Sequence, residues 1–166
     1  METQNYDFEK DKQETIFEKI FAEKIIGTNY TRYEKYFPDW DIKNNATGVT
    51  YEIKRDKKYI KTGNTLAEEW YDLEKKKKGW IQYTKADWLV VFFTDNEYYI
   101  TNMKTFINDF YNNRNLWIVK DIKQKEGFIT RNWVTPLDRI KKTFYNINKK
   151  EIKMEIKPLD RWITGD

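Results

Sequence analysis

The chain has 166 residues, of which 39% are hydrophobic, 17% aromatic and 35% charged, and this size allows one compact core but not two. Its net charge of +4 is too small to indicate a polyanionic partner by itself. The chain has no His and no Cys, which excludes Ser–His and Cys–His nucleophilic sites, His-type nucleases and zinc sites built on these ligands. Any catalysis must therefore rest on carboxylates, Lys, Tyr or bound hard cations.

The composition also bears on where the protein works. No apolar run is long enough to cross a bilayer, and the polar residues 1–12 lack the apolar core of a signal peptide. The absence of cysteine fits a reducing compartment. We therefore expect a single domain over residues 1–166, with no membrane association and a cytoplasmic location.

The first predicted elements are a helix and a β-hairpin. Apolar residues recur at helical spacing over residues 13–26, and Gly27 follows as a plausible C-terminal cap. Residues 36–42 and 49–54 then favour two strands around the turn-rich segment 44–48. The helical stripe consists of Ile16, Phe17, Ile20, Phe21 and Ile25.

The middle of the chain favours alternating strands and a helix. A short strand is expected at residues 64–69, and a Lys-rich loop containing Gly79 leads to the apolar run 88–93, which predicts a central strand buried on both faces. A turn at 95–96 precedes a strand at 98–101. A helix should follow, with an apolar stripe formed by Met103, Phe106, Ile107, Phe110 and Tyr111.

The last third suggests three further elements. Residues 127–130 read as a strand, and Thr135 and Pro136 read as the N-cap and first residue of a helix. Residues 151–156 alternate charged and apolar side chains, as an edge strand does. The helix would carry an apolar stripe of Leu137, Ile140, Phe144 and Ile147.

Three charged residues of the expected hairpin form the strongest candidate site. Glu52 and Lys54 are two residues apart on one strand and therefore share a face. If Asp41 pairs across from Glu52, two carboxylates and an ammonium converge. Clustered carboxylate oxygens hold the hard cations that phosphodiester hydrolysis requires.

The spacing Glu-x-Lys alone has little weight, because it recurs at residues 74–76, 151–153 and 155–157. Only the copy at 52–54 follows a turn-linked strand that bears an acid and precedes a buried central strand. The alternative is that these are exposed charges on a hairpin.

The motif and its surroundings carry a family resemblance. Residues 37–42 read FPDWDI and residues 51–56 read YEIKRD, followed by KTGN at 61–64 and TKADW at 84–88. In this order they resemble the PD-(D/E)XK nuclease superfamily, and more narrowly its small phage and prophage members. The similarity extends over roughly residues 38–93 and is loose from Gly127 onward.

The resemblance implies an α/β (α+β) fold with a restriction-endonuclease-like core, in which helices flank a mixed four-stranded sheet in the order αβββαβ. It also implies Mg²⁺- or Mn²⁺-dependent hydrolysis of DNA. Asp41 and Glu52 would be metal ligands together with the backbone carbonyl of Ile53, and Lys54 would position the attacking water. Most members place the first acid directly after Pro, which nominates Asp39 instead. We prefer Asp41 because Ile42 follows it, as in the small phage members.

Several neighbouring residues have two interpretations. The resemblance suggests that a glutamate of the first helix reaches the metals, with Glu18 as the first choice and Glu14 as the second. A solvent-facing salt bridge is an equally good role for either residue. Gln82 and Lys85 would contact phosphate, or Thr84 and Asp87 would merely shape the turn before the central strand. The lysines at 75–78 and at 54–61 would contact phosphate or form solvated faces. One or two of five aromatic residues would contact DNA: Tyr59, Trp70, Tyr71, Trp80 and Tyr83.

The leading prediction is thus a phage-encoded nuclease acting on DNA, including structured or branched DNA, as a homodimer in a bacterial host. A second interpretation is a catalytically inactive nuclease-fold protein that binds DNA or counters restriction. Retention of closely spaced like charges argues against it, because they repel each other without metal. A third is a phage regulatory or structural protein with no nucleic-acid role.

Overall fold

Two β-sheets form the framework of the computed structural model, which describes residues 8–33, 38–55, 62–94, 98–136 and 145–146. The larger sheet has the order β1-β2-β3-β6-β7-β10, and its β3–β6 pair is parallel while the other pairs are antiparallel. Its strands are β1 (Tyr30–Arg32), β2 (Ile42–Asn44), β3 (Thr50–Arg55), β6 (Trp88–Phe92), β7 (Tyr98–Asn102) and β10 (Tyr145–Asn146).

The smaller sheet is antiparallel, with the order β5-β4-β9-β8. It consists of β4 (Asn64–Asp72), β5 (Lys77–Lys78), β8 (Ile118–Lys123) and β9 (Ile129–Pro136). The expectation of one mixed four-stranded sheet is therefore wrong, and the fold is mixed α+β with two sheets. Strand β8 was not predicted from the sequence. Five of its six residues are exposed, so it lacks the alternation of apolar and polar residues that marks a half-buried strand.

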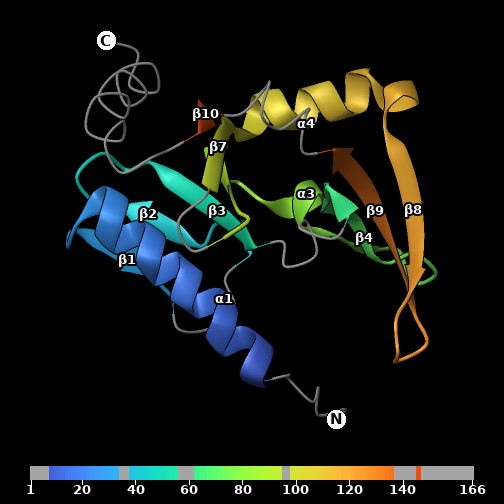
Figure 1. Ribbon diagram of the computed structural model, residues 1–166, viewed down its shortest axis with the longest axis horizontal. Helices are drawn as coiled ribbons and strands as arrows, with labels where there is room; N and C mark the ends of the chain where they lie inside the picture. Colours follow the sequence, from blue (N-terminus) through green and yellow to red (C-terminus); the bar gives the residue numbers. More distant parts are fainter. Residues whose placement is uncertain (1–7, 34–37, 56–61, 95–97, 137–144, 147–166) are drawn as a thin grey trace.

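Helices lie on both faces of the larger sheet. Figure 1 shows α1 (Phe8–Phe21) lying across the side of β1–β3, while α4 (Met103–Asn112) and the smaller sheet lie on the other side. After α1 the chain continues as the π-helix η1 (Ala22–Ile26) and stops at Gly27, whose φ of +90° suits glycine. Two shorter helical segments are α3 (Trp80–Tyr83) and η2 (Arg114–Leu116).

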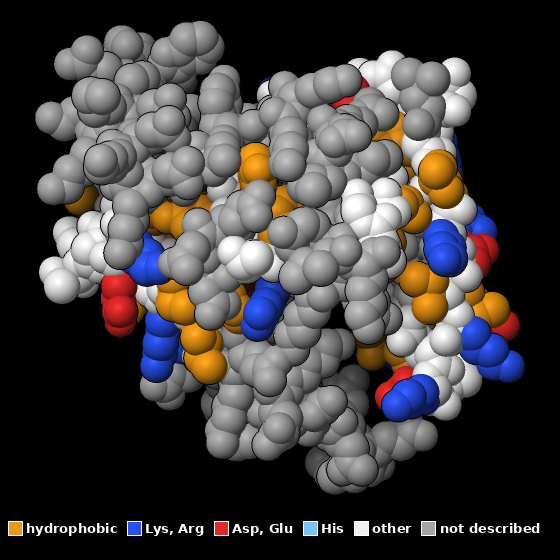
Figure 2. All heavy atoms as spheres, viewed as in Figure 1, with side chains coloured by type: hydrophobic (Ala, Val, Ile, Leu, Met, Phe, Trp, Pro, Cys, Tyr) orange, Lys and Arg blue, Asp and Glu red, His pale blue; other side chains and the backbone are white. Residues whose placement is uncertain are grey.

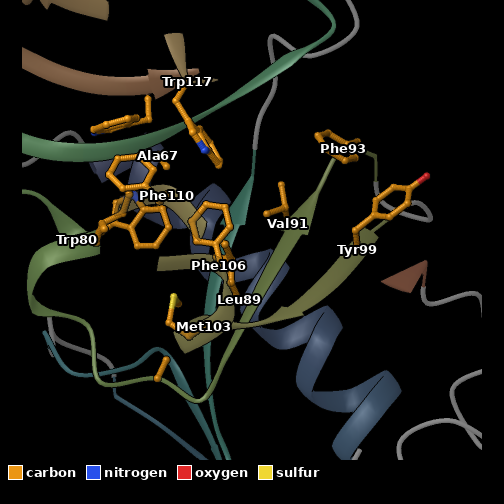
Figure 3. Close-up of a cluster of buried hydrophobic side chains, with 13 residues drawn as sticks. Ala67, Trp80, Leu89, Val91, Phe93, Tyr99, Met103, Phe106, Phe110 and Trp117 are labelled. Carbon is orange, nitrogen blue, oxygen red and sulfur yellow. The ribbon is translucent and has the colours of Figure 1, made fainter. Parts of the chain in front are cut away.

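Strand β6 separates two hydrophobic cores because alternate side chains point to opposite faces. Trp88, Val90 and Phe92 pack with Phe17 and Phe21 of α1. On the other face, β6 joins a core that includes α4 and β9, part of which Figure 3 displays. The prediction of a central strand buried on both faces is confirmed. This second core contains Trp80, Leu89, Val91, Phe93, Met103, Phe106, Phe110, Trp117 and Trp133.

Most of the predicted elements are present with shifted ends. The hairpin, β4, β7 and the helix from Met103 are confirmed. In α1, Phe17 is buried but Ile16 is exposed, so the apolar stripe is narrower than expected. Among the helices that the structure describes, none is long and apolar enough to span a membrane.

The helix expected to start at Thr135 and Pro136 does not begin there. Both residues belong to β9, where Thr135 pairs with Thr65 and Pro136 with Asn64. Proline is compatible with the end of a strand as well as with the first turn of a helix, so the local signal was ambiguous. The predicted helix was also expected to include residues 145–146, which instead form strand β10 and pair with β7. The rest of 137–147 and the strand expected over 151–156 lie outside the described residues.

Candidate active site

The β2–β3 hairpin brings Asp41 close to the strand that carries Glu52. Ile42 pairs with Tyr51 in the antiparallel register, and the backbone N–H of Asp41 donates to the carbonyl of Tyr51 at 2.9 Å. The predicted first strand is shorter than expected, because β2 begins at Ile42 and residues 38–41 precede it.

Lys54 brings the two carboxylates together. Its Nζ lies 2.6 Å from Oε1 of Glu52 and 3.9 Å from Oδ2 of Asp41. The ammonium also lies 5.4 Å from the ring centroid of Trp80, the first residue of α3. The lysine side chain is 33% exposed, so this charged centre is partly open to solvent.

Glu52 is the most enclosed of these groups, with 5% of its side chain exposed. Its register partner on β6 is Leu89, so the carboxylate points toward the second core and α3. Thr84 donates a hydrogen bond from Oγ1 to Oε2 of Glu52 at 2.9 Å. Burial raises the pKa of Glu52 above its usual range, and the nearby ammonium of Lys54 opposes this shift.

The backbone of Ile53 joins the same cluster. Its N–H donates to Oδ2 of Asp41 at 2.7 Å instead of to a neighbouring strand. In an extended strand the N–H and C=O of one residue point to the same side, so the carbonyl of Ile53 also faces the side of Asp41. Two carboxylates, an ammonium and a backbone carbonyl are therefore directed toward one place.

Glu18 approaches this cluster from α1. Arg32 of β1 binds its carboxylate at 2.5 Å, and this pair is largely buried. Burial raises the pKa of Glu18, and the second cause is the negative charge of Asp41. Glu18 therefore forms a salt bridge, but a largely buried one instead of the solvent-facing one expected, and its role as a metal ligand stays a prediction. The side chain of Glu14 lies outside the described residues.

Asp39 belongs to a different set of contacts. Its Oδ2 lies 2.9 Å from Nζ of Lys85, and its carbonyl accepts hydrogen bonds from the backbone N–H of Lys85 and Oγ1 of Thr84. Of the two candidate aspartates, Asp41 is the one that contacts Lys54.

The residues after the hairpin mainly organise the connection to β6. Asp87 accepts hydrogen bonds from both the backbone N–H and Oγ1 of Thr50 at 2.8 and 2.9 Å, which fixes the start of the parallel β3–β6 pair. Gln82 donates its side-chain amide to the carbonyl of Glu69. The interpretation in which Thr84 and Asp87 shape this turn is consistent with these contacts, and Thr84 adds a direct bond to Glu52.

The aromatic residues near the site have different environments. Trp80 is buried and Tyr83 packs against the second core. Tyr71 is 42% exposed and its ring lies 5.0 Å from that of Phe128. Trp70 is partly buried, and Tyr59 lies outside the described residues.

The donors of this cluster match the needs of a hard divalent cation. Within the described part of the chain, no three acidic side chains gather closely enough to form a metal site by themselves. Mg²⁺ does not require three, because it commonly binds one or two carboxylates and fills its octahedron with water and substrate phosphate. Asp41, Glu52 and the Ile53 carbonyl provide that donor set, and the Lys54 ammonium shows that the cluster attracts positive charge.

Three contacts of the site were not anticipated from the sequence. Arg32 binds Glu18, Thr84 binds Glu52, and Trp80 lies beside Lys54. Each joins residues that are distant in the chain, so no local spacing marks them. The comparisons with family models, curated proteins and solved structures find no match for the chain.

Proposed function

We propose that the protein is a Mg²⁺- or Mn²⁺-dependent DNA nuclease whose active site consists of Asp41, Glu52, Lys54 and the carbonyl of Ile53. The observation that carries this proposal is the Lys54 ammonium, which lies between a buried glutamate on its own strand and an aspartate on the neighbouring chain segment. A hairpin with only solvated charges would leave Glu52 exposed, whereas 5% of its side chain is exposed. The motif order that resembles PD-(D/E)XK nucleases supports the same chemistry.

Each group has a distinct role in the proposed reaction. Asp41 and Glu52 would hold the cation, which supplies Lewis-acid polarisation of the phosphodiester and makes water a better nucleophile when bound. Lys54 would orient the attacking water and balance the charge that develops on the phosphate. Water then adds to phosphorus while one P–O ester bond breaks. Thr84 would keep the Glu52 carboxylate in its orientation through the bond to Oε2.

The arrangement of β2, β3 and β6 beside α1 supports a restriction-endonuclease-like core for this part of the chain. In that view the smaller sheet is an addition on the face opposite α1. We further propose that the protein acts in the cytoplasm of a bacterial host as a phage-encoded enzyme. Because cutting two strands needs two sites, we propose a homodimer, for which light scattering should give twice the monomer mass of 20.4 kDa.

One observation favours a catalytically inactive DNA-binding protein as the second candidate. Both oxygens of Glu52 already have protein partners, namely Lys54 and Thr84. A descendant that had lost metal binding would preserve such a neutralised cluster for stability alone. This candidate predicts DNA binding without cleavage at any concentration of Mg²⁺ or Mn²⁺.

The test is cleavage of supercoiled and branched DNA by the purified protein with Mg²⁺, Mn²⁺ or EDTA. The matched variants are Glu52→Gln and Lys54→Met, with Glu74→Gln as the control because Glu74 is exposed and belongs to one of the other Glu-x-Lys spacings. We expect cation-dependent cleavage by the wild type and Glu74→Gln only. Cleavage by a folded Glu52→Gln protein would refute the assigned site, and binding without cleavage by the wild type would favour the second candidate.

A further inference from the structure

The far end of the smaller sheet carries a surface that the proposed active site does not use. The turn between β4 and β5 comes next to the start of β9, since the N–H of Leu73 donates to the carbonyl of Ile129 at 2.9 Å. Beside this contact, the exposed ring of Tyr71 stacks at a tilt on Phe128. The basic surface, as we call it, consists of Tyr71, Phe128 and the exposed lysines Lys75, Lys76, Lys77, Lys78, Lys123 and Lys125.

The charge of the basic surface is complementary to a polyanion. Within residues 73–78 and 123–127, the exposed acids Glu74 and Glu126 stand against six exposed lysines. Asp72 is buried, accepts a hydrogen bond from the N–H of Lys75, and lies 3.9 Å from the ammonium of that lysine, so it offsets part of the charge of Lys75. Figure 2 shows Lys and Arg side chains interspersed with hydrophobic and acidic ones on the right of the view, where Figure 1 places β8 and β9.

One lysine occupies a backbone conformation that its side chain disfavours. Lys76 has a φ of +52°, in the left-handed region where glycine or asparagine is the usual residue of a tight turn. A glycine here would relax the turn and remove the charge.

The basic surface connects directly to the proposed active site. The lysine run ends at Gly79, and Trp80 follows with its ring beside the Lys54 ammonium. The chain from Lys76 to Trp80 covers at most about 13 Å, because an extended residue advances about 3.3 Å. A nucleic-acid strand that leaves the active site can therefore meet these lysines within a few nucleotides.

We propose that the basic surface holds a single-stranded segment of the DNA substrate, with the lysines contacting phosphates and Tyr71 stacking on an unpaired base. The inference rests on the proposed function for its choice of DNA. Base–aromatic stacking tolerates any sequence and requires an exposed ring whose other face is supported, as Phe128 supports Tyr71. The proposed substrate is thus DNA with a duplex at the active site and a single-stranded extension over the smaller sheet.

The test measures binding of fluorescent DNA by anisotropy in EDTA, so that cleavage plays no part. The probes are a duplex, and the same duplex with a single-stranded extension. For Lys75→Gln/Lys76→Gln we expect weaker binding of the extended probe and a salt dependence reduced by about 1.4 in log–log slope, which is roughly 0.7 for each phosphate contact. The matched control is Lys24→Gln/Lys104→Gln, which removes two exposed lysines from η1 and α4.

Substitutions of the ring separate stacking from charge. Tyr71→Leu keeps an apolar contact with Phe128 but has no flat ring, so we expect roughly tenfold weaker binding of the extended probe and unchanged binding of the duplex. Tyr71→Trp should bind the extended probe as the wild type does. Lys76→Gly should weaken binding while raising the Tm by about 2 °C, because it relieves the turn.

Three results would overturn the inference. The first is an equal loss of DNA affinity in the control double variant and in Lys75→Gln/Lys76→Gln. The second is an equal effect of Tyr71→Leu on the binding of both probes. The third is equal binding of the two probes by the wild type. Binding as proposed by a protein that cleaves nothing would preserve the basic surface and reject the nuclease. Cleavage of DNA together with equal binding of the two probes would support the nuclease and reject the role of the basic surface.

Discussion

Asp41 and Glu52 share one cation, because the ammonium of Lys54 contacts the carboxylates of both. The ammonium lies 2.6 Å from Glu52 and 3.9 Å from Asp41, so the positive charge is shared unequally. A divalent cation in the same place would attract both carboxylates more strongly than one ammonium does. Without metal, the ammonium offsets one of the two carboxylate charges, whereas a divalent cation would offset both.

The two candidate aspartates should differ sharply on substitution. Asp41→Asn is expected to lower the Mg²⁺-dependent cleavage rate by roughly a thousandfold, since a metal ligand contributes several kcal/mol of transition-state stabilisation. Asp39→Asn is the matched change two residues away and should retain most activity, because Asp39 pairs with the exposed Lys85. Cleavage rates and Mn²⁺ affinity by calorimetry measure both effects. Loss of Mn²⁺ binding in Asp39→Asn alone would transfer the ligand role to Asp39.

Thr84 should act as a positioning residue for Glu52. Thr84→Val keeps the shape of the side chain but removes the donor to Oε2, and we expect about tenfold lower activity or metal affinity. Thr84→Ser retains the hydroxyl and should restore most of the loss. A titration of cleavage rate against Mn²⁺ concentration distinguishes weaker metal binding from misfolding, which high Mn²⁺ would not rescue. Equal defects in the two variants would argue against the hydrogen bond as the cause.

The buried carboxylate should make stability depend on pH in a specific direction. Burial raises the pKa of Glu52 above its ordinary value of 4.5, so the native state keeps this proton to a higher pH than the unfolded chain does. The stabilisation that comes from the retained proton is fully present below pH 4.5 and is lost as the pH rises through the raised pKa of Glu52. The Tm of Glu52→Gln minus the Tm of the wild type, measured in EDTA, should therefore increase from acidic to neutral pH. A Tm difference that stays constant from pH 4 to 8 would contradict this, with Glu74→Gln as the exposed control.

Gly79 is the position where a methyl group should be most disruptive. A Cβ there would lie 2.3 Å from the carbonyl oxygen of Glu68, a backbone atom that cannot rotate away. We expect Gly79→Ala to lower the free energy of unfolding by about 1–3 kcal/mol, or to displace α3 from β4. Urea unfolding measures the first outcome, and reduced cleavage measures the second because Thr84 follows α3. A Gly79→Ala protein with wild-type stability would show that the contact is not maintained in solution.

Local patterns predicted the elements whose signal is contained in neighbouring residues. The apolar run at 88–93, the spacing from Met103 to Phe110, and the placement of Glu52 and Lys54 on one face all agree with the structure. The smaller sheet was predicted in part, because strands were expected at the positions of β4 and the start of β9 but not at β5 or β8. Its edge strand β8 exposes both faces, and Thr135 and Pro136 have local signals that fit a helix start equally well.

The contacts between distant segments needed the structure. No spacing in the sequence indicates that Arg32 meets Glu18 or that Trp80 lies beside Lys54. Likewise, a hairpin pattern could not separate Asp39 from Asp41, because both were expected on the same strand face. The structure places the strand start after both residues and gives them different partners.

The hydrogen bond from the Ile53 amide to Asp41 gives the site an internal spectroscopic probe. A backbone amide within β3 that donates to a carboxylate shifts its ¹⁵N and ¹H resonances when that carboxylate changes its partner. A single peak in a two-dimensional NMR spectrum can therefore follow cation titration, substrate docking or substitution at residue 41, without a label on the nucleic acid. The backbone amides of β6 and β7, whose strands pair with each other, supply the reference against which that peak is read.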